Sequence, residues 1–472
     1  MHYYWHISID MDLLQRRHLI HVFLFLTFVF IFEICASGVN LFSTQLKSGV
    51  KLDDEIKPIE VYGLPLTIIL YFLRLLALLP LPVIICHTIG ILAFNVFKEK
   101  PELRYSQLVS PGICIRVVTR GDFPELVRQN VIRNVATCDR VGLVKFILEV
   151  VTDKPVPLDI DPRVHQTVVP EKYTTSTGAM YKSRALQYAL ETTSLNESDW
   201  IVHLDEETLL TDNCLYGILN FVNDGQSQIG QGLITYGNEN VVNLVTTLAD
   251  SIRVGTDLGL LRFCLKTLHA PLFLFKGSFV VCQVSCEQRV TFDFGKRGSI
   301  AEDMYFAMVA MSKGYRFGWI EGEMWEKSPF TFWDFIQQRK RWIQGIILIV
   351  HDSKLPLGVR FCLGIGLYAW LTVPLTTSNI FLTPLCPIAL HPIVKLLVGY
   401  IAAVTIYLYL LGAVRSFSLA RLGYFQFILR VVGALGTIPI VAICECIAII
   451  WGVLTPKNKF YVVNKQIAQI LV

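Results

Sequence analysis

Three consecutive acidic residues, Asp205, Glu206 and Glu207, directly follow the apolar segment Trp200–Leu204. Neighbouring carboxylates repel one another and lose hydration when they are buried, so they need a compensating cation. Because side chains alternate along an extended segment, we expect Asp205 and Glu207 to project together and Glu206 to point away. Such a pair suits Mg²⁺ or Mn²⁺, which proteins hold through one or two carboxylates plus substrate phosphates. The alternative is a solvated acidic turn, with Asp205 capping the next helix.

A second acidic pair, Glu302 and Asp303, opens a predicted helix over Met304–Lys313. The helix dipole favours acidic residues in a first turn, and this alone is enough to explain their placement. The catalytic interpretation makes Asp303 a general base, which takes the proton of a hydroxyl group within hydrogen-bond reach. The pair by itself does not distinguish the two interpretations.

A basic and aromatic segment, Gln337–Trp342, precedes the last apolar part of the chain. Its residues Gln338, Arg341 and Trp342 share one face of a helix, because they are spaced i, i+3 and i+4. On that face Arg341 can pair bidentately with a diphosphate, and Trp342 can stack against a sugar. Basic and aromatic residues are also expected at a membrane interface whatever the function, so this alternative stays open.

These candidate residues need a scaffold, and the chain around them alternates between strand-like and helix-like segments. Predicted strands cover Gly112–Thr119, Val144–Val151 and Trp200–Leu204, and predicted helices cover Phe123–Thr137 and Ser176–Thr193. This alternation predicts an α/β domain with a mostly parallel sheet. Ligands of such sheets bind beyond the carboxyl ends of the strands. The polar residues that close or follow these strands are Thr119, Arg120, Asp122, Asp153, Asp205 and Glu207.

The composition indicates that part of the chain lies in a membrane. Of its 472 residues 53% are hydrophobic and 17% are charged, whereas a soluble domain has about 25% charged residues. A helix of about 20 apolar residues is long enough to cross a bilayer core. The candidate spans are Leu19–Gly38, Tyr62–Phe97, Gly358–Thr376, Val394–Leu411 and Phe427–Val453. The proline-rich segment Pro374–Pro392 is expected to be broken or re-entrant. We therefore expect transmembrane regions at residues 1–100 and 355–472 around a soluble domain at residues 101–354.

The distribution of charge limits the partners and the orientation. A net charge of +4 over this length gives no electrostatic footprint for nucleic acid, so nucleic acid is not an expected partner. Arg16 and Arg17 precede the first apolar segment, and Lys98, Lys100 and Arg104 follow the second. If the second segment crosses once, the positive-inside rule places the central domain in the cytosol, whereas a hairpin there inverts the orientation.

The order of these motifs resembles that of the family-2 glycosyltransferases, which are membrane-attached enzymes with a GT-A fold and a D, D-x-D, E-D, Q-x-x-R-W pattern. The matching residues are Asp153, Asp205–Glu207, Glu302–Asp303 and Gln338–Trp342, and the resemblance extends over about Gly112 to Gly345. Glu207 departs from the family, which usually has Asp there. A longer carboxylate still reaches a metal, so this difference affects geometry more than the presence of an ion.

The resemblance implies a role for each matching residue. Asp205 and Glu207 would bind Mg²⁺ or Mn²⁺, and Asp303, beside Glu302, would be the catalytic base. Trp342 would contact the acceptor. The donor would be bound by Thr119, Arg120, Asp153, Asp205, Gln338 and Arg341.

Three stretches further resemble the invertebrate β-1,4-mannosyltransferases of this family: Thr119–Asp122, His203–Thr208, and the run from Ala301–Phe306 to Trp342. This resemblance implies an inverting transfer of mannose from GDP-mannose to the 4-hydroxyl of glucosylceramide, during glycosphingolipid synthesis in the Golgi or endoplasmic reticulum membrane. The lipid bilayer is then a partner too, because it holds the acceptor.

Other functions share these features. A UDP-glucose-dependent ceramide glucosyltransferase and a polysaccharide synthase carry the same motifs. A polytopic transporter or scaffold is the alternative outside the enzymes, with the ionisable residues of its apolar segments as a relay: Glu33, Arg74, Arg430 and Glu445. The complete set of acidic motifs and Q-x-x-R-W favours an enzyme.

Overall fold

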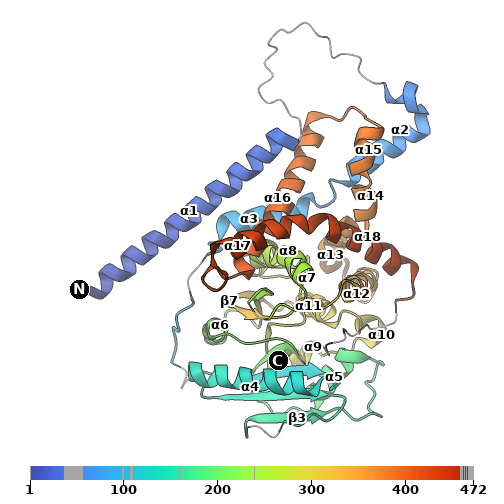
Figure 1. Ribbon diagram of the computed structural model, residues 1–472. Helices are drawn as coiled ribbons and strands as arrows, with labels where there is room; N and C mark the ends of the chain where they lie inside the picture. The colour runs from blue at the N-terminus through green and yellow to red at the C-terminus, as the bar shows by residue number, and fades with distance from the viewer. Residues whose placement is uncertain are drawn as a thin grey trace.

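The computed structural model of the protein describes residues 2–36, 57–97, 100–106, 110–158, 161–238, 240–457, 461, 463 and 465, with the backbone alone for 2–15. An α/β domain forms one part of the molecule. Helices from both parts of the chain that flank this domain in sequence lie together on one side of it (Figure 1).

The centre of the α/β domain is a seven-stranded sheet with the order β3-β2-β1-β4-β6-β5-β7. The strands are β1 (Ile113–Thr119), β2 (Phe146–Thr152), β3 (Val164–Val168), β4 (Trp200–Asp205), β5 (Ile229–Thr235), β6 (Val280–Gln283) and β7 (Phe317–Trp325). Only β6 runs antiparallel to its neighbours β4 and β5. The predicted mostly parallel sheet is confirmed.

Helices cover both faces of this sheet, as the buried β-branched sequences of β1 and β2 require. One apolar cluster packs α4 (Pro124–Val141) and α6 (Asp212–Asp224) on the sheet, and another packs α5 (Tyr181–Glu191) and α11 (Glu302–Ser312). The other helices of the domain are α7 (Leu244–Ala249), α8 (Ser251–Thr256), the π-helices η2 (Asp257–Leu261) and η3 (Cys264–Leu268), α9 (Val284–Val290), α10 (Gly295–Gly298) and α12 (Phe332–Val350).

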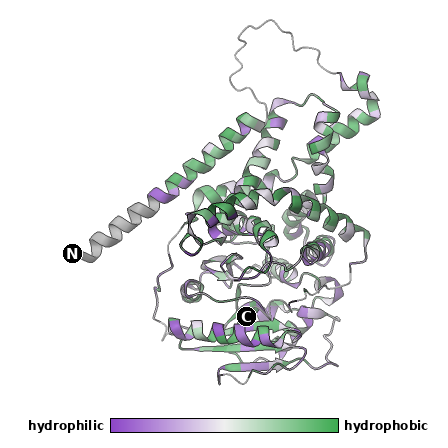
Figure 2. Cartoon of the chain, in the orientation of Figure 1, coloured by the Kyte–Doolittle hydropathy of each residue, from purple (hydrophilic) through white to green (hydrophobic). Residues whose placement is uncertain are grey.

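Where Figure 2 shows their hydropathy, the flanking helices are mostly apolar. They are α1 (His2–Ala36), α2 (Pro58–Leu76), α3 (Leu81–Ala93), α13 (Leu357–Leu371), α14 (Val373–Thr377), α15 (Asn379–Leu385), α16 (Pro392–Ser416), α17 (Leu419–Gly436) and α18 (Ile438–Leu454). Within the described chain, four segments are long and apolar enough to cross a membrane: Arg16–Cys35, Pro58–Ala93, Pro392–Ser416 and Leu419–Gly436. A fifth is possible if α13 and the bent α14–α15 form one span. The predicted membrane regions at both ends are therefore confirmed as apolar helices.

One predicted span is wrong. The segment Phe427–Val453 is not a single helix, because α17 ends at Gly436 and α18 begins at Ile438. Pro439 lies at the second position of α18 and has no N–H to donate to the preceding turn. Proline is compatible with a first helical turn but not with the interior of a continuous helix, so the chain breaks here.

Candidate active site

A cavity of about 910 Å³ lies beyond the carboxyl ends of β1, β2 and β4. We call it the strand-end cavity. Every site residue expected from the sequence contributes to its lining: Thr119, Arg120, Asp153, Asp205, Glu207, Glu302, Asp303, Gln338, Arg341 and Trp342. The structure thus brings together residues that are up to about 220 positions apart in the chain, as the strand-end rule for parallel sheets anticipates.

Two lysines neutralise the acidic triplet at the end of β4. Lys182 of α5 lies with its Nζ 2.5 Å from Oδ1 of Asp205. Burial opposes ionisation of Asp205, but the Lys182 ammonium holds its pKa below the ordinary value. Lys465 donates to Glu207, while burial raises the pKa of Glu207.

The expectation that Glu206 points away from its neighbours is wrong. Its Oε1 lies 2.8 Å from Nζ of Lys465, the same ammonium that contacts Glu207. Glu206 also accepts a hydrogen bond from the hydroxyl of Thr119. The chain leaves the extended conformation at Asp205 and turns, so the alternation of side chains along a strand no longer applies.

Glu302 and Asp303 are placed by the first turn of α11. Burial, with the neighbouring Asp303 charge, raises the pKa of Glu302 to about 7, and burial also raises the pKa of Asp303. Oδ1 of Asp303 accepts from the backbone N–H of Met304 at 2.7 Å. The backbone of Gly277 lies close to this carboxylate, since a Cβ added there would lie 3.2 Å from Oδ2 and 3.3 Å from Nζ of Lys182. The arrangement therefore places a carboxylate of raised pKa in the lining of the strand-end cavity.

The residues of α12 line the wall of the strand-end cavity. Oε1 of Gln338 is buried and has no hydrogen-bond partner among the described residues. The positive charge of Arg341 favours the ionised forms of Asp205, Glu302 and Asp303, and so works against the effect of burial on their pKa values. The ring of Trp342 has the guanidinium carbon of Arg339 at 4.5 Å and that of Arg253 at 5.0 Å from its centroid. These cation–π contacts fix the orientation of the indole.

On the side of β1 and β2 the lining is more exposed. Asp153 accepts a hydrogen bond of 2.6 Å from the guanidinium of Arg184. Arg120 is 3.5 Å from Asp122, with 58% of its side chain exposed. These polar groups leave an accessible edge at which a nucleotide base or ribose can be bound.

Sequence reasoning missed several charged residues of this cavity. Lys182 and Lys465 belong to no motif, and Lys465 contacts a carboxylate 258 positions away. Glu326 follows β7 directly, so the strand-end rule finds it once β7 is known. Burial, together with the charges of Asp205 and Glu207, raises the pKa of Glu326 to about 7.

The acidic residues fit a divalent cation that is held together with a phosphate ligand. No group of three or more His, Cys, Asp or Glu side chains in the part of the chain that the structure describes has the arrangement of a metal site. Mg²⁺ needs only one or two carboxylates when substrate phosphates supply other ligands. Burial, together with neighbouring carboxylates, raises the pKa values of Glu207, Glu302 and Glu326, and a bound cation would favour their ionised forms.

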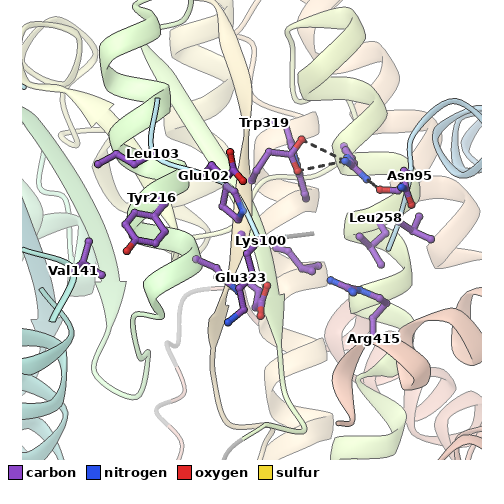
Figure 3. A pocket seen from close by; sticks show the side chains of 17 residues that line it. Asn95, Lys100, Glu102, Leu103, Val141, Tyr216, Leu258, Trp319, Glu323 and Arg415 are labelled. Atoms are coloured by element: carbon purple, nitrogen blue, oxygen red, sulfur yellow. Dashed lines mark hydrogen bonds and ion pairs between the residues drawn. The ribbon is translucent and has the colours of Figure 1, made fainter. Parts of the chain in front are cut away.

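A second cavity of about 820 Å³ is lined by a different set of residues (Figure 3). Arg415 of α16, Glu323 of β7 and Tyr216 of α6 contribute to it, together with Lys100 and Glu102. It contains neither the acidic triplet nor the α11 and α12 residues. Its mixture of charges is not connected to the predicted chemistry, so the strand-end cavity is the candidate active site.

Comparisons with known proteins identify the family. Residues 200–438 match the family model described as glycosyl transferase family group 2. The chain is 52% identical over 453 residues to "Beta-1,4-mannosyltransferase egh" of Drosophila melanogaster, covering 96% of this chain and 98% of that one. It is 51% identical over 413 residues to "Beta-1,4-mannosyltransferase bre-3" of Caenorhabditis elegans, covering 87% and 91%.

Among solved structures, the mannosyltransferase PcManGT from Pyrobaculum calidifontis, in complex with GDP-Man and Mn²⁺, superposes with a TM-score of 0.46 and 16% identity, over 73% of this chain and 98% of that one. The family assignment rests on the sequence matches, which extend over nearly the whole chain. The protein belongs to the family-2 glycosyltransferases, the enzyme family that its motif order predicts.

Proposed function

We propose that the protein is an inverting β-1,4-mannosyltransferase that moves mannose from GDP-mannose to the 4-hydroxyl of glucosylceramide. The observation that carries this proposal is the 52% identity to a β-1,4-mannosyltransferase over 96% of the chain. The gathering of all the predicted site residues in the strand-end cavity supports it. The reaction is a step of glycosphingolipid synthesis.

Asp205 and Glu207 would hold Mg²⁺ or Mn²⁺, which when bound neutralises negative charge on the diphosphate leaving group. Arg341 would pair with the same diphosphate, and Gln338, whose buried Oε1 has no partner in the described part of the chain, would contact the donor from α12. Arg120 and Asp153, at the accessible edge of the cavity, and the buried Thr119 would bind the guanosine part.

Asp303 would act as the base. Its carboxylate, in the lining of the strand-end cavity, takes the proton of the acceptor 4-hydroxyl while that oxygen attacks the anomeric carbon. The bond from this carbon to the diphosphate breaks as the new bond forms on the opposite face, so an α-linked donor gives a β-linked product. Burial raises the pKa of both Asp303 and its neighbour Glu302, and Trp342 would contact the acceptor sugar.

We place the enzyme in the Golgi or endoplasmic reticulum membrane, with residues 101–354 in the cytosol between membrane regions 1–100 and 355–472. The support is the positive charge of Arg16 and Arg17 before the first span. Asn196 is exposed and begins the sequence Asn-Glu-Ser, an N-glycosylation acceptor. A glycosidase-sensitive shift of the protein on a gel, abolished in Asn196→Gln, would place the domain in the lumen and contradict this orientation.

A radiolabelled transfer assay on membranes containing the protein tests the function. GDP-mannose and UDP-glucose are offered separately, each with ceramide or glucosylceramide, with Mg²⁺ or Mn²⁺ and with EDTA. We expect label from GDP-mannose on glucosylceramide, and loss of label in EDTA. If label is transferred only from UDP-glucose, the donor is UDP-glucose and the protein is a glucosyltransferase.

The role of Asp303 is tested in the same assay. We expect Asp303→Asn to lose transfer and to retain GDP-mannose binding, because a neutral amide cannot take the proton but preserves the shape of the site. Glu171→Gln, an exposed carboxylate outside the cavity, is the control and should behave as the wild type. Equal loss of binding and transfer in Asp303→Asn would make Asp303 a structural residue.

A further inference from the structure

The strand-end cavity changes character between its two ends. One end, the carboxylate end, contains Asp205, Glu207 and Asp303. The other, which we call the membrane end, is lined by apolar residues of three separate parts of the chain: Val83, Phe273, Leu274, Leu363, Gly366 and Leu367. A nucleotide sugar has no apolar portion that could use such a surface, so the membrane end needs another occupant.

The membrane end is bordered by helices of the flanking membrane regions. Val83 belongs to α3, which is part of the candidate span Pro58–Ala93, and Leu363, Gly366 and Leu367 belong to α13. Both helices lie in the group on the membrane side of the α/β domain (Figure 1). Apolar lining in these helices is continuous with the cavity that holds the candidate catalytic residues.

A buried network holds the wall of the membrane end in place. Glu445 of α18 accepts a hydrogen bond of 2.9 Å from Nε1 of Trp370 on α13 and lies 3.0 Å from Nε of Arg339 on α12. Arg339 also donates to Asp250 at 2.7 Å. Polar and charged side chains thereby connect α12, α13 and α18. These contacts fix the helices that surround the apolar space.

We propose that the membrane end binds the hydrocarbon tail of the acceptor lipid, and that Gly366 keeps this space open. The proposal rests on the proposed function and deepens it, since it makes an amphiphile with a long apolar tail the required class of acceptor. The sugar of such an amphiphile reaches Asp303 while its tail stays in an apolar environment. This arrangement avoids exposing methylene groups to water.

Gly366 offers a direct way to fill the space. A Cβ added at Gly366 would meet only the Cδ1 atom of Phe273, at 3.9 Å, so a larger side chain extends into the cavity without a backbone clash. Gly358 lies on the same helix, has no heavy atom within 4 Å of an added Cβ, and does not line the cavity. Leucine has a higher helix propensity than glycine, so both substitutions should favour the helix. Gly366→Leu and Gly358→Leu therefore form a matched pair.

The experiment compares two acceptors on the full-length protein in membranes. We expect Gly366→Leu to lower kcat/KM at least tenfold for long-chain glucosylceramide and to leave transfer to methyl β-glucoside within twofold. Gly358→Leu should change neither rate. Equal effects of Gly366→Leu on both acceptors, or no effect on either, would overturn the proposal.

A second measurement separates this proposal from the proposed function. Glucosylceramide with a diazirine in its acyl chain is photocrosslinked to the protein without a donor. We expect crosslinks on α3 or α13 in the wild type and in Gly358→Leu, and fewer in Gly366→Leu. Crosslinking without any transfer of mannose would overturn the proposed function alone, whereas crosslinks unchanged in Gly366→Leu would overturn the role of the membrane end.

Discussion

The two ends of the strand-end cavity are built by opposite physical means. At the carboxylate end, charged groups are buried together. Lysines neutralise some of these carboxylates, and burial raises the pKa of others, such as Glu302. At the membrane end, apolar side chains of α3 and α13 border the space, and the ion pair of Arg339 with Glu445 holds the helices of its wall together. Charged groups therefore line the end where bonds would change, whereas at the end where a substrate would enter apolar side chains line the space and the charged groups join the helices around it.

The difference also extends to where the residues come from. The carboxylate end takes most of its groups from positions that directly follow strands or begin a helix, such as Asp205 and Asp303. The membrane end joins Val83 of α3 to Leu363 of α13, which only tertiary packing brings together. If the two ends function independently, a substitution at one end should leave the function of the other unchanged. The following predictions test this independence.

The largest effect is expected at Asp205. Asp205→Ala removes a proposed metal ligand and leaves Lys182 without its 2.5 Å partner. Transfer should fall by about 1,000-fold, the scale of losing one preorganised charge-stabilising group. Diazirine crosslinking of the lipid tail should be unchanged, and Glu171→Ala is the surface control. A parallel loss of crosslinking would show that the two ends are coupled.

The next largest effect concerns the network that joins α12 to α18. Arg339→Met leaves the partly buried Glu445 without its guanidinium partner and removes the shorter of the two guanidinium contacts of the buried Asp250, which keeps its 3.3 Å pair with Arg253. Breaking a buried ion pair costs about 3 kcal/mol of stability. Thermal unfolding in detergent should show a clearly lower stability for Arg339→Met than for the wild type. Arg128→Met, whose exposed 3.8 Å pair with Glu125 is worth about 0–1 kcal/mol, should show almost none.

A smaller effect is expected at Lys465, which competes with a metal for the acidic triplet. Lys465→Met frees Glu206 and Glu207 from an ammonium, so the Mn²⁺ concentration for half-maximal transfer should fall about tenfold. The maximal rate should also fall, because a positive charge is lost beside the diphosphate. Lys457→Met, outside the cavity lining, is the control. An unchanged Mn²⁺ curve would mean that Lys465 does not shield the carboxylates.

The fold was predictable where local patterns dominate. The β-branched runs of β1 and β2 and the acidic residues after β4 identify the parallel half of the sheet. The other half gave no such signal: β6 has four residues and runs antiparallel, and β7 carries a register shift beside β5 and a glycine, Gly322, at φ 93°. Those features depend on tertiary pairing, which periodicity in the sequence does not report.

The same limit applies to the candidate site. Motif spacing was sufficient for Asp205, Asp303 and Arg341, because each lies at a strand end or on a helix face. It was insufficient for Lys182 and Lys465, since the choice of an ion-pair partner depends on which segments the fold brings together. The turn after Asp205 likewise decides that Glu206 shares the Lys465 ammonium with Glu207.

The smallest effect, on stability, is expected at Glu326, and its sign depends on pH. Burial raises the pKa of Glu326 to about 7 from 4.5, so between these values the folded protein binds more protons than the unfolded chain. Stability from this group is therefore lost as pH rises through 7, by about 1 kcal/mol between pH 6 and pH 8.

Glu326→Gln removes this titration and can keep the hydrogen bond from Thr208, because the amide oxygen also accepts. Relative to the wild type, the variant should gain stability from pH 6 to pH 8 in thermal unfolding. Gly366→Leu, at the apolar end, should shift stability by the same amount at both pH values, because it adds no titrating group. A stability difference between Glu326→Gln and the wild type that does not change with pH would mean that Glu326 does not titrate with a raised pKa.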